Sequence, residues 1–101
     1  MSTMVVRMEC DPLHRDDVVR HLREDVVVWA QEQLGFASGS WHVSQDGRWG
    51  LGVVEFSSPG AAETAAEAPR GYHDPDVLFR IASVEIYEEV ATARQRSQVT
   101  Q

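Results

Sequence analysis

The first candidates for chemistry are an imidazole and two hydroxyls on one side of a predicted strand. Residues 40–44 read SWHVS, so Ser40, His42 and Ser44 alternate with Trp41 and Val43. Alternate side chains of a strand share a face, and an imidazole titrates near neutrality, so His42 is a candidate general base. A lone histidine without a partner in the sequence is also typical of a structural side chain, and both interpretations stay open.

A second group combines aromatic walls with a base and a cation. Aromatic side chains beside one arginine suit a planar, oxygenated ligand that becomes anionic. In such a pocket a histidine would accept the proton and the arginine would stabilise the anion. Ordinary core packing of the tryptophans and an inert loop at residues 71–77 are the alternatives. The group consists of Trp29, Trp41, Tyr72, His73 and Arg80.

Charged residues on other predicted strands form a third group. Arg7 with Glu9, Glu55 and Glu85 could form a polar network, in which neighbouring carboxylates share a proton. Arg7 and Glu55 are the candidates for contacts with a substrate. The alternative is a set of ion pairs that fixes how two chains align.

Metal and thiol chemistry have weaker signals. Cys10 is the single cysteine, which excludes an intrachain disulfide and a cysteine zinc cluster. Its place in an apolar alternating stretch favours a small buried side chain over a reactive thiol. His14 and His21 roughly share a helix face, but no further ligand pattern accompanies them. We therefore expect no metal and no cofactor.

The charge balance excludes some classes of partner. Sixteen acidic residues against nine basic ones give a formal net charge of −7. This acidity argues against nucleic acid or an anionic membrane surface as a binding partner, because binding to either requires clustered cations on the protein. The N-terminal residues lack a signal-peptide pattern, and no apolar run approaches the roughly 18 residues of a membrane span. We expect a cytoplasmic protein.

The elements that must position these residues follow from local patterns. Residues 3–10 alternate as a strand, and Asp11-Pro12 opens a helix that Gly35 ends. A hairpin turns tightly at Asp46-Gly47, with its second strand at about 49–56. A short alanine-rich helix follows Ser58-Pro59, and residues 79–90 form the last strand.

The order β-α-β-β-α-β predicts a ferredoxin-like α+β sandwich over residues 1–90. Right-handed crossovers give an antiparallel sheet in the order 4-1-3-2, with both helices on one face. We expect residues 91–101 to form a frayed C-terminal tail.

The face without helices carries aliphatic side chains among the polar ones. Soluble monomers seldom expose a continuous apolar patch, so we expect a homodimer that buries two such faces against each other. Arg80 is assigned to the opposite, helix-covered face. The predicted apolar patch consists of Leu51, Val53, Ile81 and Tyr87.

Two stretches carry a resemblance to a known family. They are GFASGSWHVSQDGRWGLGVVEFSSPGAAETAA at 35–66 and IASVEIYEEV at 81–90. They resemble the dimeric α/β-barrel superfamily, most closely its antibiotic-biosynthesis-monooxygenase-like proteins. The resemblance implies a dimer whose two sheets close into a barrel. It also implies activities such as cofactor-free oxidation of aromatic polyketides or haem degradation.

The chain departs from the resembled active sites. It contains no asparagine, whereas the haem-degrading and the polyketide-oxidising members both use one. Its second predicted helix has no tryptophan or histidine, so haem degradation is discarded. Tyr72 and Arg80 match the tyrosine and arginine of the polyketide-oxidising site in part. The leading interpretation is a cofactor-independent oxygenase, or a related cyclase or isomerase, acting on an aromatic or polyketide-like substrate. The alternative is a non-catalytic ligand-binding or stress-related dimer.

Overall fold

The computed structural model describes residues 1–72 and 79–96 of the chain. Within this part of the chain, no helix is long and apolar enough to cross a bilayer. Its elements are β1 (Ser2–Cys10), α1 (Arg15–His21), α2 (Val27–Gln31), β2 (Phe36–Val43), β3 (Trp49–Phe56), α3 (Pro59–Arg70) and β4 (Phe79–Glu88).

The helix expected between the first two strands is a single segment with three kinds of turn. A 3-10 turn at Pro12–His14 leads into α1, and a π-helical turn at Leu22–Val26 joins α1 to α2. The Asp11 side chain accepts a hydrogen bond from the Leu13 amide at 2.9 Å and so caps the start.

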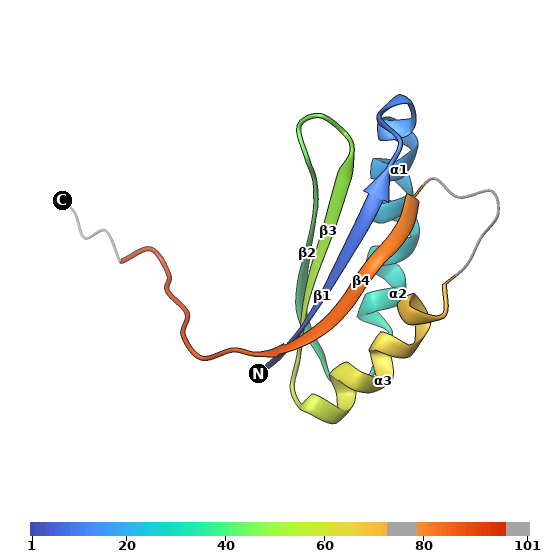
Figure 1. Ribbon diagram of the computed structural model, residues 1–101. Helices are drawn as coiled ribbons and strands as arrows, with labels where there is room; N and C mark the ends of the chain where they lie inside the picture. The colour runs from blue at the N-terminus through green and yellow to red at the C-terminus, as the bar shows by residue number, and fades with distance from the viewer. Residues whose placement is uncertain (73–78, 97–101) are drawn as a thin grey trace.

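The four strands form one antiparallel sheet in the order β2-β3-β1-β4. This is the predicted order read from the other edge, and the ferredoxin-like fold is confirmed. Both helical segments lie on the same face of the sheet (Figure 1), and the other face is uncovered in the single chain. The pairing of two such sheets into a barrel stays a prediction.

The core lies between the helices and the sheet. Alternate residues of β1 and β3 point toward the helices, where α3 supplies small alanines and the first helical segment supplies branched side chains. The alanines let α3 approach the sheet closely, as its composition predicts. The core residues include Met4, Val6, Met8, Val18, Leu22, Ala30, Val54, Phe56, Ala62, Ala65 and Ala66.

A bulge in β4 reverses the faces of its first residues. Arg7 pairs with Ser83 but Met8 pairs with Ile81, so Ala82 has no partner on β1. An extra residue shifts the alternation by one, and each side chain beyond it changes face. Ile81 therefore packs on the helix side. Arg80 lies on the open face, opposite Glu9, and both assignments made from strict alternation were wrong.

The hairpin turn lies at the predicted place and is wider than expected. Residues 44–48 connect β2 to β3, and the Gly47 amide donates to the Ser44 carbonyl at 2.9 Å. The Asp46 carboxylate accepts from the Ser44 hydroxyl and the Arg48 amide. These contacts, with the Ser44 hydrogen bond foremost, hold the pKa of Asp46 below its ordinary value.

Gly47→Val should destabilise the fold by about 1 kcal/mol or more. Gly47 has φ of 76°, which β-branched side chains resist, and a Cβ there would lie 3.2 Å from Pro12 Cα. Chemical denaturation would measure the change in unfolding free energy. Gly60→Val is the control, because its Cβ would meet open space. Equal effects of the two substitutions would refute this account of the turn.

Candidate functional site

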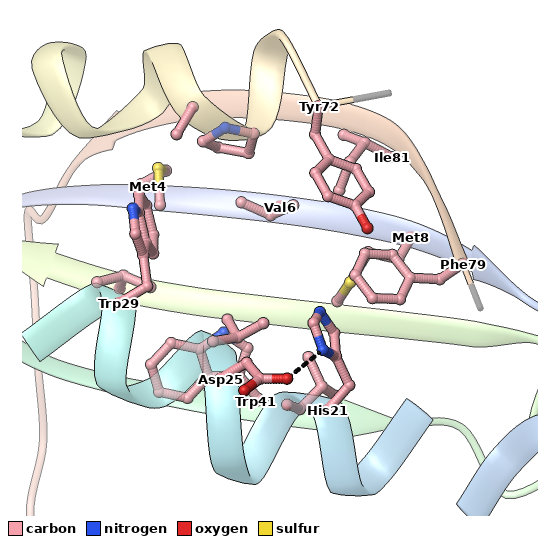
Figure 2. A pocket seen from close by; sticks show the side chains of 15 residues that line it. Met4, Val6, Met8, His21, Asp25, Trp29, Trp41, Tyr72, Phe79 and Ile81 are labelled. Atoms are coloured by element: carbon pink, nitrogen blue, oxygen red, sulfur yellow. Dashed lines mark hydrogen bonds and ion pairs between the residues drawn. The ribbon is translucent and has the colours of Figure 1, made fainter. Parts of the chain in front are cut away.

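A cavity of about 310 Å³ lies between the sheet and the helices (Figure 2). Its floor is the helix-facing side of β1 with neighbouring strands, and its rim comes from the first helical segment and the end of α3. The lining is almost entirely apolar. The lining residues are Met4, Val6, Met8, His21, Leu22, Asp25, Val26, Trp29, Trp41, Val54, Ala68, Pro69, Tyr72, Phe79 and Ile81.

Aromatic side chains from four parts of the chain wall this cavity. Trp29 comes from α2, Trp41 from β2, Tyr72 from the turn after α3 and Phe79 from β4. The Tyr72 ring stacks on Phe79 with centroids 5.7 Å apart and planes 13° apart. The structure thus brings together Trp29, Trp41 and Tyr72, which the sequence grouped in one pocket.

A glycine in β3 makes room for one of these walls. Gly52 pairs with Trp41 across the sheet, and a Cβ at Gly52 would lie 3.0 Å from the indole ring. A glycine inside a strand is typical of a place that another group approaches closely. At Gly52 the Trp41 indole is that neighbour.

A histidine and an aspartate that the sequence did not assign to this pocket form the polar edge of the cavity. His21 Nδ1 lies 2.7 Å from Asp25 Oδ2. The His21 side chain is 30% exposed and that of Asp25 is 66% exposed, so the pair sits where the cavity meets solvent. The signal in the sequence was the four-residue spacing on one helix, which places both on one face.

The predicted base of this pocket is untested, and the predicted cation lies elsewhere. His73 lies outside the described residues. Arg80 lies on the open face, where its guanidinium is 2.6 Å from Glu9 Oε1. Among the described residues that line the cavity there is no arginine, and the group of five is only partly brought together.

His42 lies on the open face, as its alternation predicts. In the single chain it is exposed, and its Nε2 lies 3.0 Å from Ser40 Oγ. It borders a hollow with Arg7, Ser44 and Trp49. An enclosed chamber around His42 requires a second copy of the chain and stays a prediction.

The charged residues of the open face form separate pairs. Arg7 Nε lies 3.9 Å from Glu85 Oε1, and Tyr87 donates to the same carboxylate oxygen at 3.0 Å. That hydrogen bond to Glu85 raises the pKa of the Tyr87 phenol.

Glu55 lies apart from Arg7 on this face. Its position on β3 is opposite Thr3, whereas Arg7 is opposite Leu51. Glu55 accepts from the Ser38 hydroxyl at 3.0 Å. A hydrogen bond shared with Glu89 lowers the pKa of Glu55 and raises the pKa of Glu89. The two predicted substrate contacts are therefore not in one site within a single chain.

Metal and thiol chemistry gain no geometric support. Within residues 1–72 and 79–96, no three His, Cys, Asp or Glu side chains cluster in a way that could hold a metal ion. Cys10 is partly buried at the end of β1, and this burial raises the pKa of its thiol. A raised pKa lowers the thiolate fraction, which favours the structural interpretation.

Comparison with known proteins gives matches in structure. No protein-family model and no curated protein sequence matches the chain. The haem degrader MhuD from Mycobacterium tuberculosis, with two haems bound in its active site, matches with a TM-score of 0.72. The sequences are 13% identical, and the match covers 93% of this chain and 100% of that one.

Two oxygenases from Streptomyces match as well. A monooxygenase from the gene ActVA-Orf6 of Streptomyces coelicolor, in complex with nanaomycin D, has a TM-score of 0.64 and 18% identity over 93% of this chain and 91% of that one. The cofactor-independent oxygenase SnoaB from Streptomyces nogalater, in a mutant form, has a TM-score of 0.62 and 14% identity over 93% and 97%. At these identities the likeness establishes the fold. Over nearly its whole length the chain has the fold of antibiotic-biosynthesis-monooxygenase-like proteins, and the resemblance predicted from the sequence is confirmed.

Proposed function

We propose that the protein is a cofactor-independent, monooxygenase-like enzyme that binds a planar aromatic or polyketide-like substrate between the sheet and the helices. The observation that carries this proposal is the cavity itself, with Trp29, Trp41 and Tyr72 as its walls and one polar edge. Aromatic walls favour flat rings, and few polar groups fix their orientation. Structural relatives that include a monooxygenase and a cofactor-independent oxygenase support the reaction class.

The chemistry requires only a deprotonated substrate and dioxygen. An electron-rich anion, held away from water, transfers electrons directly to O₂, which is the oxidant. A ring methylene becomes a carbonyl that retains one oxygen atom, and the two hydrogens leave with the other atom as water. The protein's part is to bind the ring, remove a proton and exclude solvent.

A binding role without turnover is the second candidate. The observation that favours it is the position of Arg80 on the opposite face, because this removes the predicted anion-stabilising cation from the cavity. A binder needs the aromatic walls but no base. The two functions share the same site and differ in whether a bound phenol loses its proton.

The homodimer belongs to this proposal. The open face exposes Trp49 and Tyr87 by about half and holds half-buried Val5, Leu51 and Val53 between them. A second copy would cover this apolar area. His42, Arg7 and Glu55 would then border an enclosed chamber and act there as an additional polar site.

Binding of 7-hydroxycoumarin, a planar phenol, tests the cavity as the ligand site. We expect saturable quenching of tryptophan fluorescence, with Kd at or below about 1 mM for a probe of this size. Trp49 lies on the open face, so the titration is repeated with Trp49→Phe, which leaves only Trp29 and Trp41. Quenching that disappears in this variant would place the ligand on the open face and contradict the proposal.

A further inference from the structure

We infer that His21 is the general base of the proposed site and that Asp25 is the residue that positions it. This assignment rests on the proposed function and gives the cavity a residue to accept the substrate's proton. It replaces the sequence-based candidates His42 and His73 in that role for this cavity. Four observations carry it: the contact with Asp25, the direction of the second ring nitrogen, the packing of the ring and the local helix geometry.

The contact with Asp25 selects one tautomer of His21. A carboxylate can only accept, so at 2.7 Å the neutral imidazole carries its proton on Nδ1. Nε2 then has a lone pair that can take a proton. The other ring nitrogen of His21 points into the cavity, toward Met8 and Phe79, on the side to which the Tyr72 hydroxyl also points (Figure 2). The basic atom thus faces the space where a ligand would lie.

Packing holds the imidazole in this orientation. Its ring lies 5.6 Å from the Phe79 ring, with planes inclined by 40°, and Phe79 in turn stacks on Tyr72. A solvent-exposed pair four residues apart on a helix is common and contributes little to stability. His21 differs because its side chain is mostly covered and lines an apolar cavity. An ordinary surface ion pair does not line a cavity, so this position favours a role for His21 at the ligand site.

The helix changes its geometry at this pair. The Val27 amide bonds to the Leu22 carbonyl, five residues back, so the turn between α1 and α2 is π-helical. Such single wide turns inside helices occur frequently at functional sites. Here the turn begins directly after His21 and contains Asp25, while Leu22 beside it is buried in the core.

The proposed step is a proton transfer with no change in oxidation state. The O–H bond of a bound phenol or enol breaks, the proton moves to His21 Nε2, and the electron pair stays on the substrate oxygen. The imidazolium then lies between that anion and Asp25. Among the described lining residues, the other titratable group that faces the cavity is Tyr72. His21 would therefore supply the positive charge that the sequence assigned to Arg80.

Ionisation of bound 7-hydroxycoumarin tests this assignment, because its phenol and phenolate absorb at different wavelengths. The bound probe should ionise at least about one pH unit lower in the wild-type protein than in His21→Gln, a tenfold shift of the equilibrium. Asp25→Asn should keep the affinity within about threefold and lose part of the shift. His14→Gln is the control, since His14 is on the same segment and does not line the cavity.

The outcomes separate the two proposals. Binding by His21→Gln with wild-type ionisation of the probe would overturn the role of His21 and leave the ligand site standing. No binding by the wild-type protein would overturn the ligand site, and the base assignment with it. Nitrogen-15 NMR of the wild-type imidazoles, which needs no variant, should find His21 protonated at Nδ1. Protonation of the neutral ring at Nε2 would contradict the assignment.

Discussion

Val53→Asp is expected to turn a dimer into monomers or insoluble protein. Val53 lies near the middle of the uncovered face, opposite Val5 on β1 and Ser40 on β2. If a second copy covers this face, the new carboxylate is buried without a partner, which costs several kcal/mol. Sedimentation equilibrium or light scattering should find about twice the chain mass of 11.3 kDa for the wild-type protein. Any Val53→Asp variant that stays soluble should have the mass of a single chain.

Val28→Asp is the matched control for this experiment. Val28 lies in α2, is 48% exposed and is remote from the open face. The control should keep the wild-type mass. A wild-type protein of single-chain mass at micromolar concentration would contradict the dimer, as would a Val53→Asp variant that still sediments as a dimer.

Val6→Phe should abolish binding in the cavity, with at least a tenfold loss of affinity for 7-hydroxycoumarin. Val6 is a central β1 residue whose side chain points into the space between Trp29, Tyr72 and Phe79 (Figure 2). A phenyl ring there takes the place of the ligand's ring. Extra volume in a closely packed core costs about 1–3 kcal/mol, but here an existing cavity receives it, so the fold should persist.

The control for the cavity is Val28→Phe, which adds the same ring on the outside of the helical segment. It should bind the probe as the wild-type protein does. Fluorescence titrations measure the affinity of the two variants for the probe, and thermal melts show whether they are folded. Unchanged affinity in a folded Val6→Phe variant would exclude the cavity as the binding site.

The fold was predictable because each element carries its own pattern. The alternation in β1, the Asp11-Pro12 start of the first helical segment, and the alanine-rich α3 are all local signals. Their order along the chain then leaves few topologies once right-handed crossovers are required. The sheet order followed from these rules without knowledge of any side-chain contact.

The faces of β4 were not predictable in the same way. The bulge opposite Arg7 and Met8 depends on how β4 pairs with β1, and no residue type in β4 predicts it. Strict alternation therefore placed Arg80 beside the aromatic cavity, where the structure places Ile81. One unpaired residue removed the predicted cation from the site.

The polar edge of the cavity was missed for a different reason. His21 lies in a helical segment, so no strand pairing indicates which residues it faces. Its four-residue spacing to Asp25 is equally typical of an ion pair on the protein surface. Which way the ring points depends on the rotation of the helical segment over the sheet and on the π-helical turn at Leu22–Val26. Trp29 and Trp41 could be grouped from their type alone, because large aromatic side chains are usually buried near a core.

The most direct test of the ligand site is a crystal structure of the wild-type protein with 7-hydroxycoumarin. The account predicts density for the probe between the sheet and the helices, in contact with Trp29, Trp41 and Tyr72, with its hydroxyl within hydrogen-bonding distance of His21 Nε2. Density for the probe on the open face beside His42, with the cavity filled by protein side chains, would contradict it.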